Sequence, residues 1–530
     1  MRAQDISIER EVASRGNFYN LGDLIDKSRE LHKIAVIDLG GETAPREFSF
    51  DALDRMANGV ARSLLAYGLA RGERVALLSA NRAEYLAAYY GIMRAGLVAV
   101  PVNFKFPRAL IDVVLRDSGV RLVFCDPPRR PDCPRTLPVV DFGDAGPQGF
   151  ARFLDHGSFT AVRPAPTEPA MFLYTSGSTG RPKGVVLSHH SHLWVVHTRL
   201  GGHDISRHRY LIAAPLYHMN ALALAKLACA AHATIVLLPQ FTTTAYIEAI
   251  ERFRCTWLTS VPPMIAMMLK EKALLAKTDL SSVECLRMGS APVSPLLMAG
   301  IREIFPTTVV TNAYGTTEAG PVVFGPHPKR LPPPELSVGY PHPEVQMRLV
   351  DGTNRHADEG VLEMKCPALM LGYHNRPDLK PPFTDEGFYV TGDVFRRDAH
   401  GFYYFVGRVD DMFVSGGENI YPGEVEKMLE THPAIEQACV VPIDDDIKGQ
   451  KPVAFVVLRP GVALTDEDVK RYALTQAPAY QHPRYVWFID ALPLSSTNKV
   501  DRTQLAATAR ARLEAAQGTA PTTSRLYVDT

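Results

Sequence analysis

Residues able to do chemistry are densest between positions 174 and 184, where the chain reads Tyr-Thr-Ser-Gly-Ser-Thr-Gly-Arg-Pro-Lys-Gly. Four hydroxyl side chains and two glycines fall within six residues, and two cations follow them. Glycines let the backbone approach an anion closely, while hydroxyl and backbone N–H groups donate hydrogen bonds to it. We therefore expect a polyphosphate-binding loop formed by Thr175, Ser176, Gly177, Ser178, Thr179, Gly180 and Lys183.

This loop differs from the Walker A loop of other nucleotide-binding proteins. Pro182 stands where that motif needs glycine, and Gly184 follows Lys183 where it needs Ser or Thr. The alternative is a polar surface loop without a ligand, but the density of donors beside a lysine favours phosphate binding.

Five further segments make the chain resemble the acyl-adenylate-forming enzymes, the superfamily of acyl-CoA synthetases, peptide-synthetase adenylation domains and firefly luciferase. The resemblance extends from about residue 20 to 510 and implies ATP, Mg²⁺ and coenzyme A as cofactors. In chain order, the segments are 287–292 (RMGSAP), 312–318 (NAYGTTE), 389–393 (YVTGD), 407–417 (GRVDDMFVSGG) and 497–499 (TNK).

Several residues of these segments are expected at the nucleotide by resemblance. Ser290, Ala291 and Pro292 match the adenine-side loop, and Asn312, Ala313 and Thr316 belong to the next block. In that block Tyr314 is expected on the adenine face, and Gly315 would leave room for the acyl group. Thr317 would hydrogen-bond the α-phosphate, and Glu318 would supply a hard carboxylate oxygen for Mg²⁺. A lone Glu at this place could also be an ordinary helix-start charge.

The last segments are expected to bind ribose and to supply a mobile cation. Asp393 matches the carboxylate that accepts both ribose hydroxyls, Arg408 reaches the same sugar, and Asp410 is the hinge between two domains. Lys499 would move in to contact the carboxylate and the α-phosphate, where its charge stabilises the developing negative charge. Asn498 stands where the family commonly has glycine.

Four other residues are assigned to coenzyme A, and one to the junction of the acyl and CoA sites. Gly416 and Gly417 resemble the loop that lines the pantetheine tunnel. For Arg94 and Tyr480, a contact with the CoA nucleotide and a purely structural role stay open. His218 matches the junction position, although a lone histidine is more often structural.

The resemblance implies an acid–CoA ligase, in which a carboxylate and MgATP give acyl-AMP and pyrophosphate, and CoA then gives acyl-CoA and AMP. Pocket stretches 218–224, 289–291 and 314–322 are small or apolar, so we expect an apolar monocarboxylate, either aryl or medium-chain aliphatic. The alternatives are an adenylating enzyme that loads a carrier protein, and a non-catalytic nucleotide-binding protein of the same fold.

Periodicity predicts the elements that position these residues. Helical and strand periods alternate over 51–125 and 207–313, short strands fill 336–405, and a mixed unit begins after Gly407. The segment 126–170 shows little pattern of its own. We expect an α/β protein with a largely parallel sheet: a large domain over residues 1–407, with layered sheets and a β-rich subdomain, and a small mobile α+β domain over 408–530, whose tail from about 518 is loose.

Composition and charge exclude other classes. The chain has 530 residues with 57 basic and 57 acidic side chains, which gives no electrostatic reason to expect nucleic acid. Seven scattered cysteines without a CxxC pair, and no long apolar run, suggest a cytoplasmic enzyme without a membrane segment. The sequence leaves open whether the protein forms a homodimer.

Overall fold

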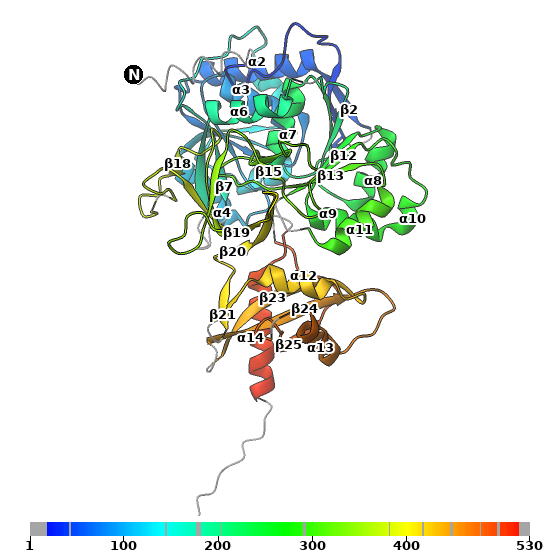
Figure 1. Ribbon diagram of the computed structural model, residues 1–530. Coiled ribbons are helices and arrows are strands. Elements are labelled where there is room, and N and C mark those ends of the chain that lie inside the picture. The colour runs from blue at the N-terminus through cyan, green and yellow to red at the C-terminus, as the bar shows by residue number, and fades with distance from the viewer. Residues whose placement is uncertain are drawn as a thin grey trace, which may run out of the picture.

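The computed structural model describes residues 18–41, 44–143, 146–175, 182–202, 204–289, 293–380, 382–415, 418–445, 449–477, 479–495 and 499–518. A large domain carries the chain to about residue 408, and a small domain lies beneath it in Figure 1. This confirms the expected α/β class with a second, smaller domain.

The first sheet of the large domain has seven strands, parallel except at the β1–β2 edge. Its order is β13 (Val309–Ala313), β12 (Cys285–Gly289), β11 (Trp257–Ser260), β9 (Arg209–Ile212), β10 (Thr234–Leu237), β1 (Ile34–Asp38) and β2 (Arg46–Ser49). The helices connecting it are α7 (Met219–Ala230), α8 (Thr243–Arg252), α9 (Pro262–Lys270), α10 (Lys272–Leu275) and α11 (Pro295–Ile304).

The second sheet also has seven strands, parallel in its centre and antiparallel from β7 to β18. Its order is β18 (Gly372–His374), β8 (Lys183–Ser188), β7 (Pro169–Thr175), β4 (Val98–Pro101), β3 (Arg74–Leu78), β5 (Val120–Cys125) and β6 (Val139–Asp141). Its helices are α2 (Phe50–Ala66), α3 (Ala83–Arg94), α4 (Arg108–Ser118), η1 (Pro127–Asp132), α5 (Phe150–Phe153) and α6 (His189–Leu200). The main apolar core joins both sheets through α2, α3, α5, α6 and α7.

The segment 126–170 is not the patternless connection that the sequence predicts. It contains η1, α5 and β6, which forms an edge of the second sheet beside β5. The prediction of a connection with little pattern was therefore wrong. The sequence gives no sign of β6 because a strand of three residues is too short to show a period.

The β-rich subdomain is a four-stranded antiparallel sheet, with a separate two-stranded ribbon beside it. The sheet contains β16 (Gln346–Val350), β17 (Glu359–Lys365), β19 (Tyr389–Arg397) and β20 (Tyr403–Arg408), and the ribbon contains β14 (Phe324–Gly325) and β15 (Tyr340–Pro341).

The small domain is a five-stranded sheet covered by helices, with α12 turned toward the large domain (Figure 1). Its elements are β21 (Phe413–Ser415), β22 (Glu418–Ile420), α12 (Pro422–Glu430), β23 (Ile435–Asp445), β24 (Gly449–Leu458), α13 (Asp466–Gln476), β25 (Tyr485–Phe488) and α14 (Arg502–Gly518). Lys270 of α9 and Glu436 of β23 form an ion pair of 2.7 Å across the domain boundary. No helix in the described residue ranges is long and apolar enough to cross a bilayer.

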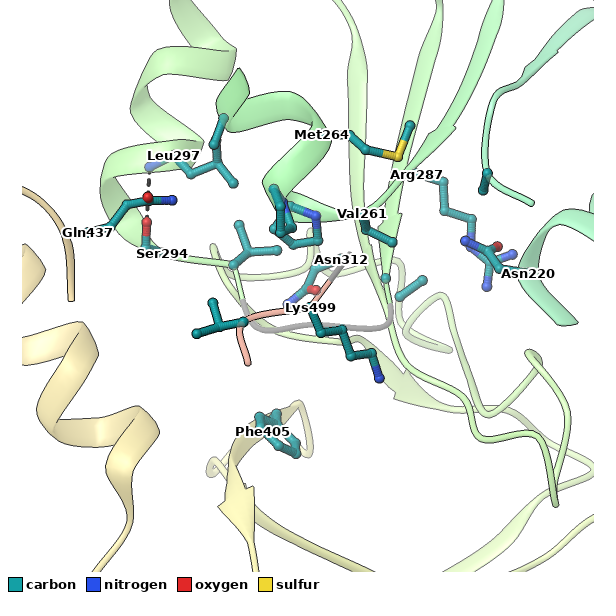
Figure 2. Close-up of a pocket in the computed structure, with 18 of the residues that line it drawn as sticks. Asn220, Val261, Met264, Arg287, Ser294, Leu297, Asn312, Phe405, Gln437 and Lys499 are labelled. Carbon is teal, nitrogen blue, oxygen red and sulfur yellow. Dashed lines mark hydrogen bonds between the residues drawn. The ribbon is translucent and has the colours of Figure 1, made fainter. Parts of the chain in front are cut away.

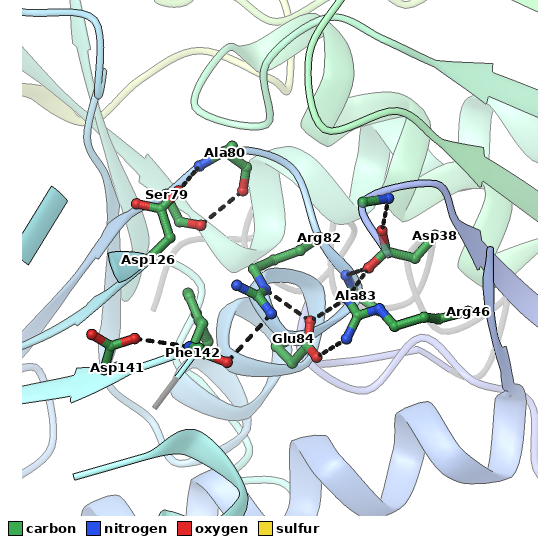
Figure 3. A network of polar contacts seen from close by, with 12 residues as sticks. Asp38, Arg46, Ser79, Ala80, Arg82, Ala83, Glu84, Asp126, Asp141 and Phe142 are labelled. Atoms are coloured by element: carbon green, nitrogen blue, oxygen red, sulfur yellow. Dashed lines mark hydrogen bonds and ion pairs between the residues drawn. The ribbon is translucent and has the colours of Figure 1, made fainter. Parts of the chain in front are cut away.

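A buried ionic network ties the two large sheets together (Figure 3). Arg46 of β2 binds Asp38 of β1 and donates to Glu84 at the start of α3 over 2.5 Å. Arg82 donates to the same glutamate over 2.9 Å. Burial alone would raise the pKa of Glu84, but the hydrogen bonds from Arg46 and Arg82 outweigh it and lower that pKa.

Replacing Arg46 by Met should destabilise the protein by about 3–5 kcal/mol, because Asp38 is fully buried and would lose its cation. Chemical unfolding measures this free energy. Arg55→Met is the matched control, since Arg55 forms only an exposed pair with Asp51. Equal losses in the two variants would show that the buried network contributes nothing special.

Lys226 is a lysine buried between α6 and α7, and its burial is expected to lower the stability of the fold. Lys226 is fully buried, and its Nζ lies 3.1 Å from Nδ1 of His192. Burial lowers the pKa of Lys226 to about 7, whereas the unfolded chain keeps an ordinary lysine near 10.5. The unfolded state therefore binds more protons between these pH values, so stability rises as pH rises from about 7 to 10.5.

Lys226→Met should stabilise the protein by roughly 2–4 kcal/mol at pH 7 or below. The gain should shrink as pH approaches 10.5, and denaturant unfolding across this pH range measures it. The exposed Lys277→Met is the control. A gain that does not change with pH would contradict a titrating Lys226.

Candidate active site

One cavity of about 2330 Å³ collects most of the residues that the sequence singles out. It opens where β7, β12 and β13 end at their carboxyl edges, the usual place for ligands in open α/β sheets. The expected residues that line it are Thr175, Lys183, His218, Asn312, Ala313, Tyr314, Gly315, Thr316, Thr317, Glu318, Asp393, Arg408, Asp410 and Lys499.

Ten predicted site residues lie outside the described part of the chain, so their assignments stay predictions. They are Ser176, Gly177, Ser178, Thr179, Gly180, Ser290, Ala291, Pro292, Gly416 and Gly417. Thr175 and Lys183, which flank the first group, are cross-strand partners at the ends of β7 and β8. Both line the cavity, so the two described residues that flank the expected phosphate loop lie at its wall.

Asp393 forms the centre of a buried polar cluster. Its side chain is about 5% exposed and accepts a hydrogen bond from the Tyr314 hydroxyl and another, of 2.8 Å, from Arg408. Asp393 and Arg408 are direct partners on β19 and β20, so the sheet register fixes this pair. Burial raises the pKa of Asp393, although Arg408 and Tyr314 oppose it. Phe395 packs edge-on against the Tyr314 ring and orients it.

Glu318 is held by a tyrosine from a distant part of the chain. The Tyr373 hydroxyl, on β18, donates to Oε1 of Glu318 over 3.0 Å. Lys183 places its Nζ 4.9 Å from the centre of the same ring. Tyr373 therefore links the lysine of the phosphate loop to the carboxylate expected at Mg²⁺.

His218 precedes α7 and faces the cavity as a neutral ring. Its Nε2 is buried and has no hydrogen-bond partner in the described part of the protein. Burial, with smaller effects of Lys499 and Lys105, lowers the pKa of His218 to about 4. The ring therefore stays neutral at pH 7 and can accept or donate one hydrogen bond.

Lys499 reaches the cavity from the small domain. Figure 2 shows its side chain extended into the space between the domains. Its backbone carbonyl accepts from the Ser495 N–H over 2.7 Å, which anchors the base of the side chain. Enclosure by the cavity walls and the nearby Arg408 lower the pKa of Lys499, while Asp393 and Asp411 oppose this. The two domains are thus arranged so that the Lys499 cation lies in the same cavity as Glu318, Asp393 and His218.

The structure gives a reason for glycine at position 315 that differs from the expected one, which was room for the acyl group. A Cβ at this position would lie 2.6 Å from the Gly320 carbonyl oxygen. The tight loop itself therefore requires glycine here, whether or not the acyl group also needs the space.

Two residues assigned to coenzyme A lie elsewhere. Arg94 is 1% exposed, donates to the Gly22 carbonyl over 2.6 Å and forms an ion pair of 2.7 Å with Asp54. It is a core residue that holds α2 and the N-terminal segment, and its burial leaves no face for a nucleotide. Tyr480 packs against the apolar core of the small domain and does not line the cavity. In this arrangement neither residue is brought to the site.

Sequence reasoning missed Tyr373 and Arg287 as site residues. Tyr373 belongs to a three-residue strand and gives no local signal. Arg287 of β12 lines the cavity, and its signal is an arginine among buried strand residues. The prediction of an apolar monocarboxylate did not include this residue among the pocket stretches.

Comparison with known proteins identifies the family of the chain. The family profile described as AMP-binding enzyme matches residues 26–374, and its C-terminal domain matches 424–499. A fatty acid–[acyl-carrier-protein] ligase from Streptomyces coeruleorubidus is 31% identical, over 87% of this chain and 91% of the relative. A 4-coumarate–CoA ligase from Oryza sativa subsp. japonica is 31% identical, over 87% and 88%.

A solved structure, ATP-bound MatB from Rhodopseudomonas palustris, superposes with a TM-score of 0.83 at 27% identity. The superposition covers 92% of this chain and 98% of the MatB chain. The profile match over both domains, with Asp393, Glu318 and Lys499 around one cavity, shows that the chain belongs to the AMP-binding, acyl-adenylate-forming enzyme family.

Proposed function

We propose that this protein is an acid–CoA ligase that works in two steps at one cavity. A carboxylate oxygen attacks the α-phosphorus of ATP, forming acyl-AMP and releasing pyrophosphate. The thiol of CoA then attacks the acyl carbon, forming the thioester and releasing AMP. The observation that carries the proposal is the placement of Lys499, from the small domain, in a cavity lined by Glu318, Asp393 and His218.

Each residue has a role that follows from its position. Asp393 accepts the ribose hydroxyls, and Arg408 keeps this carboxylate oriented. Lys183 and Thr317 line the same cavity, where they would bind the phosphates. Lys499 compensates the negative charge that develops at the α-phosphate during attack. His218, neutral and with a free ring nitrogen, lies at the acyl side.

The residues present fit Mg²⁺ that arrives with ATP. In the part of the chain described, no three His, Cys, Asp or Glu side chains gather into a metal site. Mg²⁺ commonly keeps several waters and uses one or two carboxylates with substrate phosphates, so Glu318 alone is sufficient to hold it. When bound, the ion neutralises phosphate charge. Tyr373 fixes the direction of the Glu318 carboxylate.

The acyl group would lie against an apolar wall. Met219, Val261 and Met264 line the cavity. An aryl ring or a medium-length chain would bury well against these side chains. Rotation of the small domain about Asp410 would then remove Lys499 and admit CoA to the same acyl-AMP.

The test is pyrophosphate release with MgATP over a panel of aryl and aliphatic acids, each with and without CoA. Turnover that requires CoA supports the proposal and identifies the acid. A single burst that CoA does not change would favour a separate carrier protein as acceptor. No release with any acid would favour a non-catalytic nucleotide-binding protein.

A further inference from the structure

Arg287 is a charged residue in the interior of a parallel sheet. It lies at the middle of β12, whose neighbours on both sides are β11 and β13. Leu286 and Met288 point into the apolar core on one face, so Arg287 points to the opposite face, where it lines the cavity. Central parallel strands are normally apolar on both faces, so this arginine needs a partner.

The described residues do not provide Arg287 with a counterion. Its one hydrogen bond within them goes from Nη2 to the Pro321 carbonyl over 2.9 Å, and no carboxylate there forms an ion pair with it. Burial lowers the pKa of Arg287. A second guanidinium lies near enough to be affected by this charge: burial first and then Arg287 lower the pKa of Arg199, at the end of α6, to about 9.

An amide lies beside this charge. Thr259 of β11 is the cross-strand partner of Arg287, and its hydroxyl donates to Oδ1 of Asn220 over 3.4 Å. That bond uses the amide oxygen, and no residue in the described ranges accepts from the amide NH₂ of Asn220, which can therefore donate to a ligand. Figure 2 shows Asn220 and Arg287 together at the same part of the cavity, away from Lys499. The site therefore offers a guanidinium and a neutral donor.

We propose that the acid substrate carries a second anionic group, a carboxylate or sulfonate, which binds Arg287 and Asn220 at the far end of the acyl pocket. This inference rests on the proposed acid–CoA ligase function and replaces the expected monocarboxylate with a dianionic acid. Arginine suits this role because its planar guanidinium binds such groups through two hydrogen bonds. Between the two ends, Met264 and Val261 would contact the apolar middle of the substrate.

The first experiment needs no variant. Wild-type protein is given MgATP and CoA with acids of matched shape: terephthalate against 4-methylbenzoate, adipate against hexanoate, and 4-sulfobenzoate against 4-methylbenzoate. We expect kcat/KM to be at least about 100-fold higher for the dianionic member of at least one pair. Turnover of the monocarboxylates with CoA and not of any dianionic acid would overturn the inference while leaving the ligase function standing.

The second experiment removes the charge at similar volume. Arg287→Met should lower kcat/KM for the dianionic acid by about 100-fold or more and leave that for the matched monocarboxylate unchanged or higher. Arg302→Met, on the exposed side of α11, is the control. Asn220→Leu is a second variant, expected to lower the same preference by a smaller factor.

The two failures can be told apart. If no acid gives pyrophosphate release or acyl-AMP in the wild type, the proposed ligase function itself fails. If Arg287→Met and Asn220→Leu lower kcat/KM equally for both members of each pair, the residues support the pocket but do not select the anion, and the inference is wrong.

Discussion

Lys499→Ala is expected to lower the rate of pyrophosphate release by about 10²–10³-fold, because it removes the cation placed where charge develops at the α-phosphate. The second half-reaction should change by less than about threefold. In that step the thiol attacks a mixed anhydride already formed, and Lys499 would have moved away with the small domain. Single-turnover assays measure the two steps separately, the second with chemically prepared acyl-AMP.

A matched control separates this effect from damage to the small domain. Lys470 of α13 forms local pairs with Asp466 and Glu467 of the same helix and does not line the cavity, so Lys470→Ala should leave both steps unchanged. Unchanged pyrophosphate release in Lys499→Ala would refute its role in adenylation. Equal loss in both half-reactions would show that the lysine does not act in the first step alone.

Sequence motifs predict those parts of the site that come from one short segment or from one pair of neighbouring strands. The segment from Asn312 to Glu318 begins with the last two residues of β13 and continues into the loop after it, so strand and loop together bring these residues to the cavity. Asp393 and Arg408 lie 15 residues apart, but they are direct partners in an antiparallel pair. For such residues, local geometry is enough to place the chemistry once the family is recognised.

The parts that sequence did not predict depend on long-range packing. Tyr373 reaches Glu318 from 55 residues away, through a strand too short to carry a period. Arg94 follows a helical pattern that is equally compatible with exposure and burial, and the packing of α2 and of the N-terminal segment against α3 buries it. Arg287 stands out as an arginine in an apolar strand, but only the sheet order, with β12 between two neighbours, places it in the interior of the sheet. The position of Lys499 depends on how the two domains meet.

Asp393→Asn should lower kcat/KM for ATP by about 100-fold or more, with a much smaller fall in kcat at saturating ATP. An amide of the same shape lacks the charge that both ribose hydroxyls and Arg408 need, so the loss falls on nucleotide binding. The wild type should also lose kcat/KM for ATP at acidic pH. Burial raises the pKa of Asp393, so this loss should begin above the pH expected for an ordinary aspartate.

Steady-state kinetics with ATP as the varied substrate, measured from acidic to neutral pH, tests both parts. Asp385→Asn is the control, since Asp385 is exposed in a turn and does not line the cavity. Asn at position 393 cannot titrate. The variant should therefore lose ATP affinity and should also lose the fall of kcat/KM for ATP at acidic pH that the protonation of Asp393 causes. If kcat/KM for ATP still falls at acidic pH in the variant as it does in the wild type, a group other than Asp393 titrates in that pH range. If kcat falls while KM for ATP is unchanged, Asp393 acts on the reacting phosphate, and the ribose assignment is wrong.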